Sequence, residues 1–178
     1  PNVLSELILD GNADFAAPYW NVLKKWKDYL VQYGPDPGDQ LCTDDFAGHL
    51  EHNVNLSVKA IVGIEAYAML AEMLGEQEEA EEHYILAREM AADWEVRAKA
   101  GDHYALAFGS PETWSLKYNL VWDKLWESNI FGKSVYELIQ EGLSAKLVQL
   151  PEDVRGKFRG TLSRIVNEGA NGLFCLIL

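Results

Sequence analysis

The stretch QLCTDDFAGHLEHNVNLSVK, residues 40–59, decides how the chain is interpreted. Prolines at positions 35 and 37 and a glycine at 38 interrupt any helix just upstream, and Thr43 is a good N-cap residue. Asp44 and Asp45 would then lie in the first helical turn, where each complements the helix dipole by about 0.3–1 kcal/mol. The stretch therefore predicts a long helix over residues 44–74, ended by Gly75.

One side of this predicted helix gathers residues that hydrogen-bond or titrate. At about 100° per residue, this side carries Asp45, Gly48, His49, His52, Asn55, Leu56 and Lys59. A solvated face has the same periodicity, but such faces consist mainly of Glu, Lys, Gln and Arg. The composition therefore supports a functional face. A solvated face nevertheless stays slightly ahead from the pattern alone, and both interpretations stay open.

Neighbouring carboxylates at a desolvated helix start push their pKa values apart, so Asp44 or Asp45 could act as a general base. Two capping acids would have the same sequence. His49 and His52, with Asp45, could bind zinc, but the spacing departs from H-E-x-x-H and no soft ligands accompany them. We therefore expect no metal. No phosphate-binding glycine motif and no G-x-S-x-G elbow occurs, and no cofactor is expected.

Composition narrows the class of protein. The chain has 178 residues, 48% of them hydrophobic, which is enough to form the core of one domain or part of one. A net charge of −13 argues against nucleic acid and anionic membranes as partners. Two cysteines provide no disulfide framework, and no apolar run reaches transmembrane length.

The remaining pattern is helical throughout. Apolar spacing predicts helices over residues 18–33, 76–100, 114–128 and 134–147, with weaker ones over 3–9 and 151–168. Gly75 joins the two longest helices into an antiparallel hairpin. No alternating run of useful length indicates a strand, so the predicted class is all-α.

A second polar stretch runs from Asp102 to Lys124 and mixes aromatic with hydrogen-bonding side chains. This composition is typical of a pocket for a small polar molecule or a sugar. A loop held by hydrogen bonds in a tryptophan-rich helical core has the same composition. The candidate substrate-binding residues in it are Trp114, Lys117, Tyr118, Asn119 and Asp123.

Three segments in this order resemble the helical-hairpin domain of the fungal and bacterial glutaminase A family. They are YLVQYGPDPGDQL at residues 29–41, CTDDFAGHLEHNVNLSVKAIVGIEAYAMLAEMLG at 42–75 and DHYALAFGSPETWSLKYNLVWDKLW at 102–126. The resemblance covers about residues 18–130. Gly109 stands where an acid is expected, and the likeness fades after Lys133. The family-like core would extend to about residue 150, leaving 151–178 uncertain.

The resemblance implies an (α/α)6 toroid of helical hairpins and hydrolysis of L-glutamine to L-glutamate and ammonia, outside the cell or in its envelope. Twelve helices of about 11–12 residues need roughly twice this chain, so we expect a partial toroid or fragment completed by the rest of a parent protein or by a second copy. The candidate catalytic residues are Asp44, Asp45, His49 and His52. The candidate substrate-binding residues of the first stretch are Thr43, Asn55 and Lys59. A carbohydrate-active or carbohydrate-binding toroid and a non-catalytic helical scaffold are the alternatives.

Overall fold

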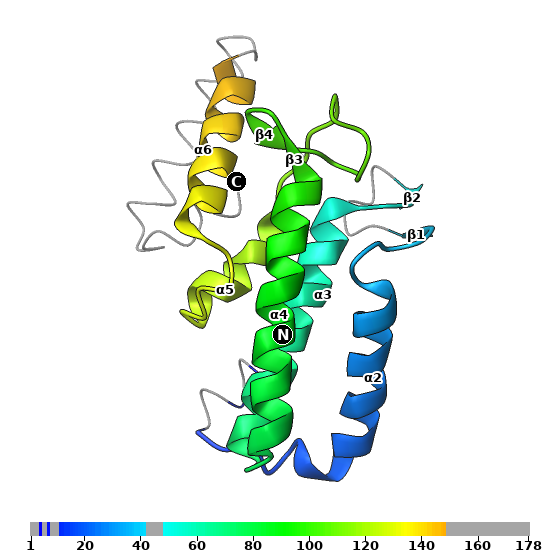
Figure 1. Ribbon diagram of the computed structural model, residues 1–178, viewed down its shortest axis with the longest axis vertical. Helices are drawn as coiled ribbons and strands as arrows, with labels where there is room; N and C mark the ends of the chain where they lie inside the picture. The colour runs from blue at the N-terminus through cyan, green and yellow to red at the C-terminus, as the bar shows by residue number, and fades with distance from the viewer. Residues whose placement is uncertain (1–3, 5–6, 8–10, 42–47, 149–178) are drawn as a thin grey trace.

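The computed structural model describes Leu4, Leu7 and residues 11–41 and 48–148, with side chains given up to residue 142 (Figure 1). The helices are η1 (Ala17–Tyr19), α2 (Trp20–Tyr33), α3 (Val54–Met73), α4 (Gln77–Ala98), η2 (Tyr118–Leu120), α5 (Val121–Leu125) and α6 (Lys133–Val148). Two short antiparallel strand pairs accompany them, β1 (Gln40–Leu41) with β2 (His49–Leu50) and β3 (Lys99–Ala100) with β4 (His103–Tyr104). The predicted all-α class is confirmed.

The hairpin of α3 and α4 forms the centre of the fold (Figure 1). Gly75 follows the end of α3 with a φ of 83°, a conformation that glycine adopts at little cost, as predicted for the turn between these helices. By length and composition, α3 could cross a membrane, but 78% of its most apolar window is buried inside the protein. Burial to this extent is typical of a helix in the core of a folded domain.

Two clusters of buried apolar side chains surround α3. The larger one joins α3, α4 and the start of α6, and its centre is the indole of Trp94. This indole donates a hydrogen bond to the Val54 carbonyl over 2.9 Å and meets the Phe131 ring edge-on at 5.4 Å. The smaller cluster packs Leu4, Leu7 and the segment before η1 against Leu70. Both therefore depend on the apolar character of α3.

Helix α2 lies along α3 and contributes no fully buried residue to the core. Its C-cap, Gly34, passes so close to α3 that a Cβ atom there would lie 2.4 Å from the Ala60 Cβ. At Gly63 a Cβ would lie 2.8 Å from the Leu30 side chain. These small residues let the two helices approach, and they leave the outer side of α2 uncovered.

The predicted start of the long helix is wrong. Helix α3 begins at Val54, ten residues later than expected, and Asn53 is its N-cap, accepting a 2.8 Å hydrogen bond from the Leu56 amide. His49 lies in β2, and His52 has a φ of 61°. The His52 amide donates a hydrogen bond to the Pro37 carbonyl, and the His52 carbonyl accepts one from the Phe108 amide. Hydrogen bonds to residues distant in sequence therefore replace the helical ones here. The proposed helical face from Asp45 to Lys59 therefore does not form.

Other expected elements are corrected or untested. The helix predicted over residues 114–128 is reduced to η2 and α5, because residues 114–117 form no regular secondary structure and Glu127 and Asn129 have positive φ. The helices over 18–33, 76–100 and 134–147 are confirmed with small shifts of their ends. The helix over 151–168 and the apolar tail lie outside the described residues, as does most of the segment 3–9.

Candidate ligand-binding groove

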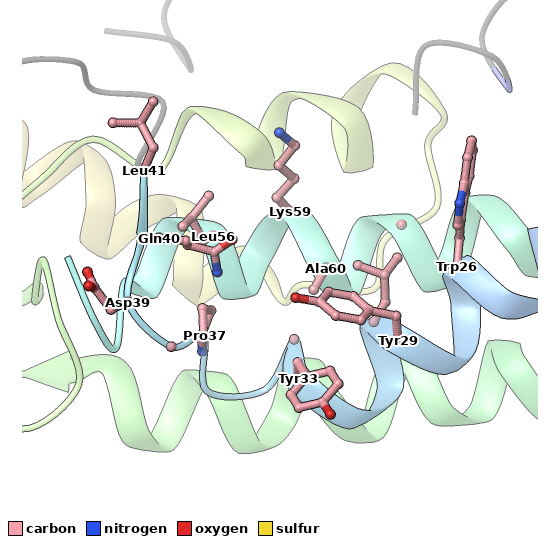
Figure 2. A pocket seen from close by; sticks show the side chains of 14 residues that line it. Trp26, Tyr29, Tyr33, Pro37, Asp39, Gln40, Leu41, Leu56, Lys59 and Ala60 are labelled. Carbon is pink, nitrogen blue, oxygen red and sulfur yellow. The ribbon is translucent and has the colours of Figure 1, made fainter. Parts of the chain in front are cut away.

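A groove of about 890 Å³ runs between α2 and α3 and reaches the segment that leads into β1 (Figure 2). Its volume is within the range of small-molecule sites in proteins. Three groups of residues line it: Trp26, Tyr29, Leu30, Tyr33 and Gly34 from α2 and its C-cap; Pro37, Gly38, Asp39, Gln40 and Leu41 from the segment into β1; and Leu56, Lys59, Ala60 and Gly63 from α3. The close approach at Gly34 and Gly63 fixes its narrow floor.

The α2 wall of the groove is aromatic. Trp26 is 62% exposed, Tyr29 58% and Tyr33 48%, although large aromatic side chains usually gain most from burial. The rings of Tyr29 and Tyr33 contact each other at 4.7 Å between centroids, with a tilt of 43°. The apolar spacing predicted the helix correctly but did not predict that these aromatic rings are exposed. The uncovered rings instead form a wall against which a flat or apolar ligand can stack.

The other end of the groove is polar. Lys59 is exposed and extends from α3, while Asp39 and Gln40 close the end at the entry to β1 (Figure 2). Among the described residues, Lys59 forms no ion pair. The groove therefore has a carboxylate and a carboxamide at the end beside β1 and a cation further along its α3 side, and this set suits a small zwitterion.

The strand pair β1–β2 borders this polar end. Leu41 lines the groove and is in register with His49 on β2, and the His49 imidazole lies 3.5 Å from the Asp39 carboxylate. The chain between the two strands includes Thr43, Asp44 and Asp45, which lie outside the described residues. The structure thus places only the two strands that flank this segment in the sequence, and the roles of Thr43, Asp44 and Asp45 stay predictions.

His52 lies at the junction of three elements. Its Nδ1 is 2.8 Å from the Asp36 carboxylate, and this hydrogen bond raises the pKa of the exposed imidazole. Arg97 of α4 reaches the same carboxylate at 3.7 Å, donates to the Pro35 carbonyl at 3.1 Å and lies over the Phe108 ring. His52 does not line the groove. Through Asp36, which also contacts Arg97, His52 connects the segment before β1 with the end of α4.

Three polar residues of the second stretch, Lys117, Asn119 and Asp123, are buried. The Lys117 side chain is 2% exposed and donates to the carbonyl of Tyr104 and to the carbonyl and hydroxyl of Ser115, over 2.7–3.3 Å. The Asn119 amide donates to Asn55 Oδ1 and its side chain donates to the Asn55 carbonyl. None of these residues lines the groove. These hydrogen bonds agree with the second interpretation of this stretch, a loop held by hydrogen bonds in the helical core.

Asp123 is also buried, at 1% exposure. Its carboxylate accepts hydrogen bonds from the Ile130 amide over 2.9 Å and from the Tyr136 hydroxyl, which joins α5 to α6. Trp114 and Tyr118 are half-buried, and the Trp114 indole lies beside Gly142 of α6. The expected convergence of both polar stretches on one cavity is therefore not found: Lys59 lines the groove, whereas Lys117 and Asp123 do not.

Glu65 was not anticipated from the sequence. It is 3% exposed within α3, and its Oε2 has no hydrogen-bond partner among the described residues. The pKa of this carboxyl is raised to about 7, chiefly by burial, with Arg88 opposing the shift and the nearby Asp123 adding to it. A single acid within the apolar run VGIEAYAML was the available signal. The groove residues Trp26, Tyr29 and Asp39 were missed because their exposure depends on how α2 meets α3.

No group of three or more histidine, cysteine or acidic residues is placed to hold a metal ion in the described part of the chain. The two histidines considered for zinc each face a different carboxylate, Asp39 for His49 and Asp36 for His52. Asp45, the third residue of that hypothesis, lies outside the described residues.

A hairpin-based all-α domain with a ligand-sized groove is the class of protein that these observations define. Residues 3–142 match the family described as glutaminase A six helical-hairpin domain, and the chain belongs to this family. It is 36% identical over 129 residues to glutaminase A of Aspergillus oryzae and 31% identical over 108 residues to a probable glutaminase of Arthroderma benhamiae. These alignments cover 70% and 60% of the chain, but only 19% and 12% of the two relatives.

The C-terminal part of the chain is also similar to a second protein family. Residues 117–178 match the family described as sporulation stage IV protein A, C-terminal. Stage IV sporulation protein A of Bacillus subtilis is 48% identical over 54 residues, which is 30% of this chain and 11% of that protein. The two family matches overlap at residues 117–142, which include η2, α5 and the start of α6. No solved structure matches the chain significantly.

Proposed function

We propose that the chain is the substrate-binding part of a glutaminase A-type amidohydrolase that converts L-glutamine to L-glutamate and ammonia. The observation that carries the proposal is the set of polar side chains that line the groove, with the exposed Lys59 on its α3 side and the exposed Asp39 and Gln40 at the end beside β1. Lys59 would hold the α-carboxylate of glutamine and Asp39 its ammonium group. The narrow floor beside Ala60 and Gly63 would accept the aliphatic part of the substrate.

The reaction requires water to attack the side-chain carboxamide, after which the C–N bond breaks and the nitrogen leaves as ammonia. A general base must take the proton of the attacking water, and the leaving nitrogen must receive a proton. Asp44 or Asp45 would be the base, either on water or on the Thr43 hydroxyl, and His49 would relay the proton from its place beside Leu41 on the rim. His52 would position this rim through Asp36.

Ammonia release from L-glutamine by the full-length parent protein tests the catalytic part of the proposal. Asp44→Ala and Asp45→Ala should each fold like the parent chain, and at least one should lower the rate about 100-fold, as loss of a general base does. Asp28→Ala, an exposed acid on α2, is the matched control and should keep the parent rate. Parent rates in both variants would refute the assignment of the base.

A second candidate function is carbohydrate binding, and the observation that favours it is the exposed aromatic wall of Trp26, Tyr29 and Tyr33. Sugar rings stack on such faces, and the volume of about 890 Å³ is larger than one amino acid fills. Calorimetric titration with oligosaccharides and with L-glutamine separates the two functions. Heat with an oligosaccharide and none with glutamine would favour the second.

Two further proposals follow from the family. The chain spans about a fifth of the Aspergillus relative, so activity of a whole enzyme would require the rest of a parent protein or a second copy to complete the ring of hairpins. We also propose an extracellular or cell-envelope location, which signal-sequence mapping or cell fractionation of the full-length protein would test.

A further inference from the structure

Trp26 differs from the other tryptophans of the chain. All six lie among the described residues, and Trp26 is 62% exposed whereas the other five are buried or half-buried. Four of these five pack against another aromatic ring, namely Trp20, Trp94, Trp122 and Trp126. A large aromatic side chain normally gains stability from such burial. The exposed indole beside the groove is therefore available to a ligand rather than to the core.

The side chains that line the groove change in character along its length. Asp39 lies at the end beside β1, Lys59 extends from α3 further along, and Trp26 lies toward the opposite end (Figure 2). Gly63 is about one helical turn beyond Lys59 on α3. A Cβ atom at Gly63 would lie 2.8 Å from the side chain of Leu30, which is about one turn beyond Trp26 on α2. The floor of the groove therefore leads from Lys59 toward Trp26.

This order determines which part of the groove a bound glutamine would leave unfilled. In the proposed function, Asp39 and Lys59 hold the ammonium and carboxylate groups, and the aliphatic part extends over the floor beside Gly63. The amide end of the ligand then points toward Tyr29 and Trp26. The groove volume of about 890 Å³ is near the upper limit of the about 300–1,000 Å³ typical of sites for drug-sized ligands, and glutamine is much smaller than these ligands. The space beside the two rings therefore suits a substituent on the amide nitrogen.

The chemistry of this end favours an aromatic substituent over a sugar. The large side chains that line it are Trp26, Tyr29, Leu30 and Tyr33, whose polar atoms are the indole nitrogen and the two phenol oxygens. A sugar carries a hydroxyl on most of its carbons, and each hydroxyl that leaves water without a partner costs free energy. An aromatic ring has no such groups and stacks in offset or edge-to-face geometry on indole and phenol rings. The aromatic end therefore accepts an aryl group at a lower desolvation cost.

We propose that Trp26 and Tyr29 form a specificity subsite for an aryl group on the amide nitrogen, so that the groove binds γ-glutamyl amides of aromatic amines more tightly than glutamine. The inference rests on the proposed function, which places the glutamyl part between Asp39 and Lys59. Hydrolysis of such an amide breaks the same C–N bond: water supplies the new hydroxyl of the γ-carboxyl group and a proton to the leaving nitrogen. The products are glutamate and the aromatic amine in place of ammonia.

Calorimetric titration of the 178-residue chain with L-glutamine and with the γ-anilide of L-glutamate tests the subsite. The γ-anilide should bind about tenfold more tightly than glutamine, which is the gain that one stacked aromatic contact supplies. Acetanilide, which has the ring and the amide without the charged groups, should bind at least about 100-fold more weakly than the γ-anilide, because it lacks both charged hydrogen bonds.

Variants on the two helices assign the gain to the rings. Trp26→Ala and Tyr29→Ala should each bring the ratio of the two affinities from about tenfold toward equality, because each removes a stacking face. Tyr19→Ala changes an aromatic residue of η1 that is 53% exposed and does not line the groove, so it is the matched control and should keep the ratio of the parent chain. Lys59→Met should weaken both ligands by the same factor, because both carry the α-carboxylate. Circular dichroism checks that every variant keeps the helical content of the parent.

Four results would overturn the inference while glutamine binding, and with it the proposed function, stands. They are equal affinity of the parent chain for glutamine and the γ-anilide, an unchanged ratio in both Trp26→Ala and Tyr29→Ala, γ-anilide binding that Lys59→Met does not weaken, and acetanilide binding as tight as that of the γ-anilide. Absence of binding by both glutamine and the γ-anilide would instead contradict the proposed function, and the inference with it.

Discussion

The two polar stretches of this chain have similar compositions and very different structures. In the stretch Asp102–Lys124, the side chains of Lys117, Asn119 and Asp123 are at least 95% buried, and their hydrogen bonds join neighbouring segments. In the earlier stretch, Gln40 and Lys59 are exposed and line a groove, as does Asp39 immediately before it. Polar residues that are buried and hydrogen-bonded chiefly specify the fold, whereas exposed ones around a groove remain able to bind a ligand.

The largest expected effect is at the buried stretch. Asp123→Ala should lower the free energy of unfolding by about 4 kcal/mol, because it leaves the Ile130 amide and the Tyr136 hydroxyl buried without their acceptor. Asp39→Ala at the groove should change it by no more than about 0.5 kcal/mol. Urea unfolding of both variants measures the contrast. Equal losses of unfolding free energy in the two variants would show that burial does not make the two stretches differ in their contribution to stability.

Glu65 should make stability depend on pH. Its pKa is raised from the usual 4.5 to about 7, so the folded protein holds a proton that the unfolded chain releases between these values. Stability from this group should therefore be highest below about pH 4.5 and fall by about 3 kcal/mol as the pH rises to 7 and above.

Comparison with Glu65→Gln isolates this contribution, because all other titrating groups are common to both proteins. The variant should match the parent near pH 4.5 and exceed its stability at pH 8, as measured by urea unfolding across the series. A constant difference between the two proteins over this range would contradict the assignment.

The helix start provides a smaller test. Asn53→Ala should lower the free energy of unfolding by about 1 kcal/mol, because the side chain caps α3 through the Leu56 amide. Thr43→Ala, at the cap predicted from the sequence, should have a smaller effect. Thermal unfolding at one pH compares the two. A larger loss of stability in Thr43→Ala than in Asn53→Ala would support the helix start predicted at residue 44.

These contrasts show which features the sequence could predict. Local periodicity and breakers located α2, α4 and α6, and Gly75 located the central turn, because these depend on neighbouring residues. The start of α3 depends instead on hydrogen bonds that the His52 and Val54 amides donate to the Pro37 and Leu106 carbonyls and that the Phe108 amide donates to the His52 carbonyl. Local sequence patterns do not encode these long-range bonds.

The site was predicted only in part for the same reason. Lys59 was identified from its chemistry, and the groove places it at a rim. Lys117 was grouped with it because both are cationic residues within polar stretches. Only the three-dimensional arrangement separates them, since the groove exists where Gly34 and Gly63 let α2 and α3 approach. Burial of Lys117 follows from its hydrogen bonds to Tyr104 and Ser115, not from its neighbours in sequence.

The most direct test of the account is calorimetric titration of L-glutamine into the parent chain, Lys59→Met and Lys117→Met. We expect Lys59→Met to keep the stability of the parent and bind glutamine about tenfold more weakly, as loss of a charged hydrogen bond to the substrate carboxylate would cause. Lys117→Met should be destabilised yet, where folded, bind with the parent affinity. Unchanged affinity in Lys59→Met, or weakened affinity in Lys117→Met alone, would contradict the assignment of the groove as the substrate site.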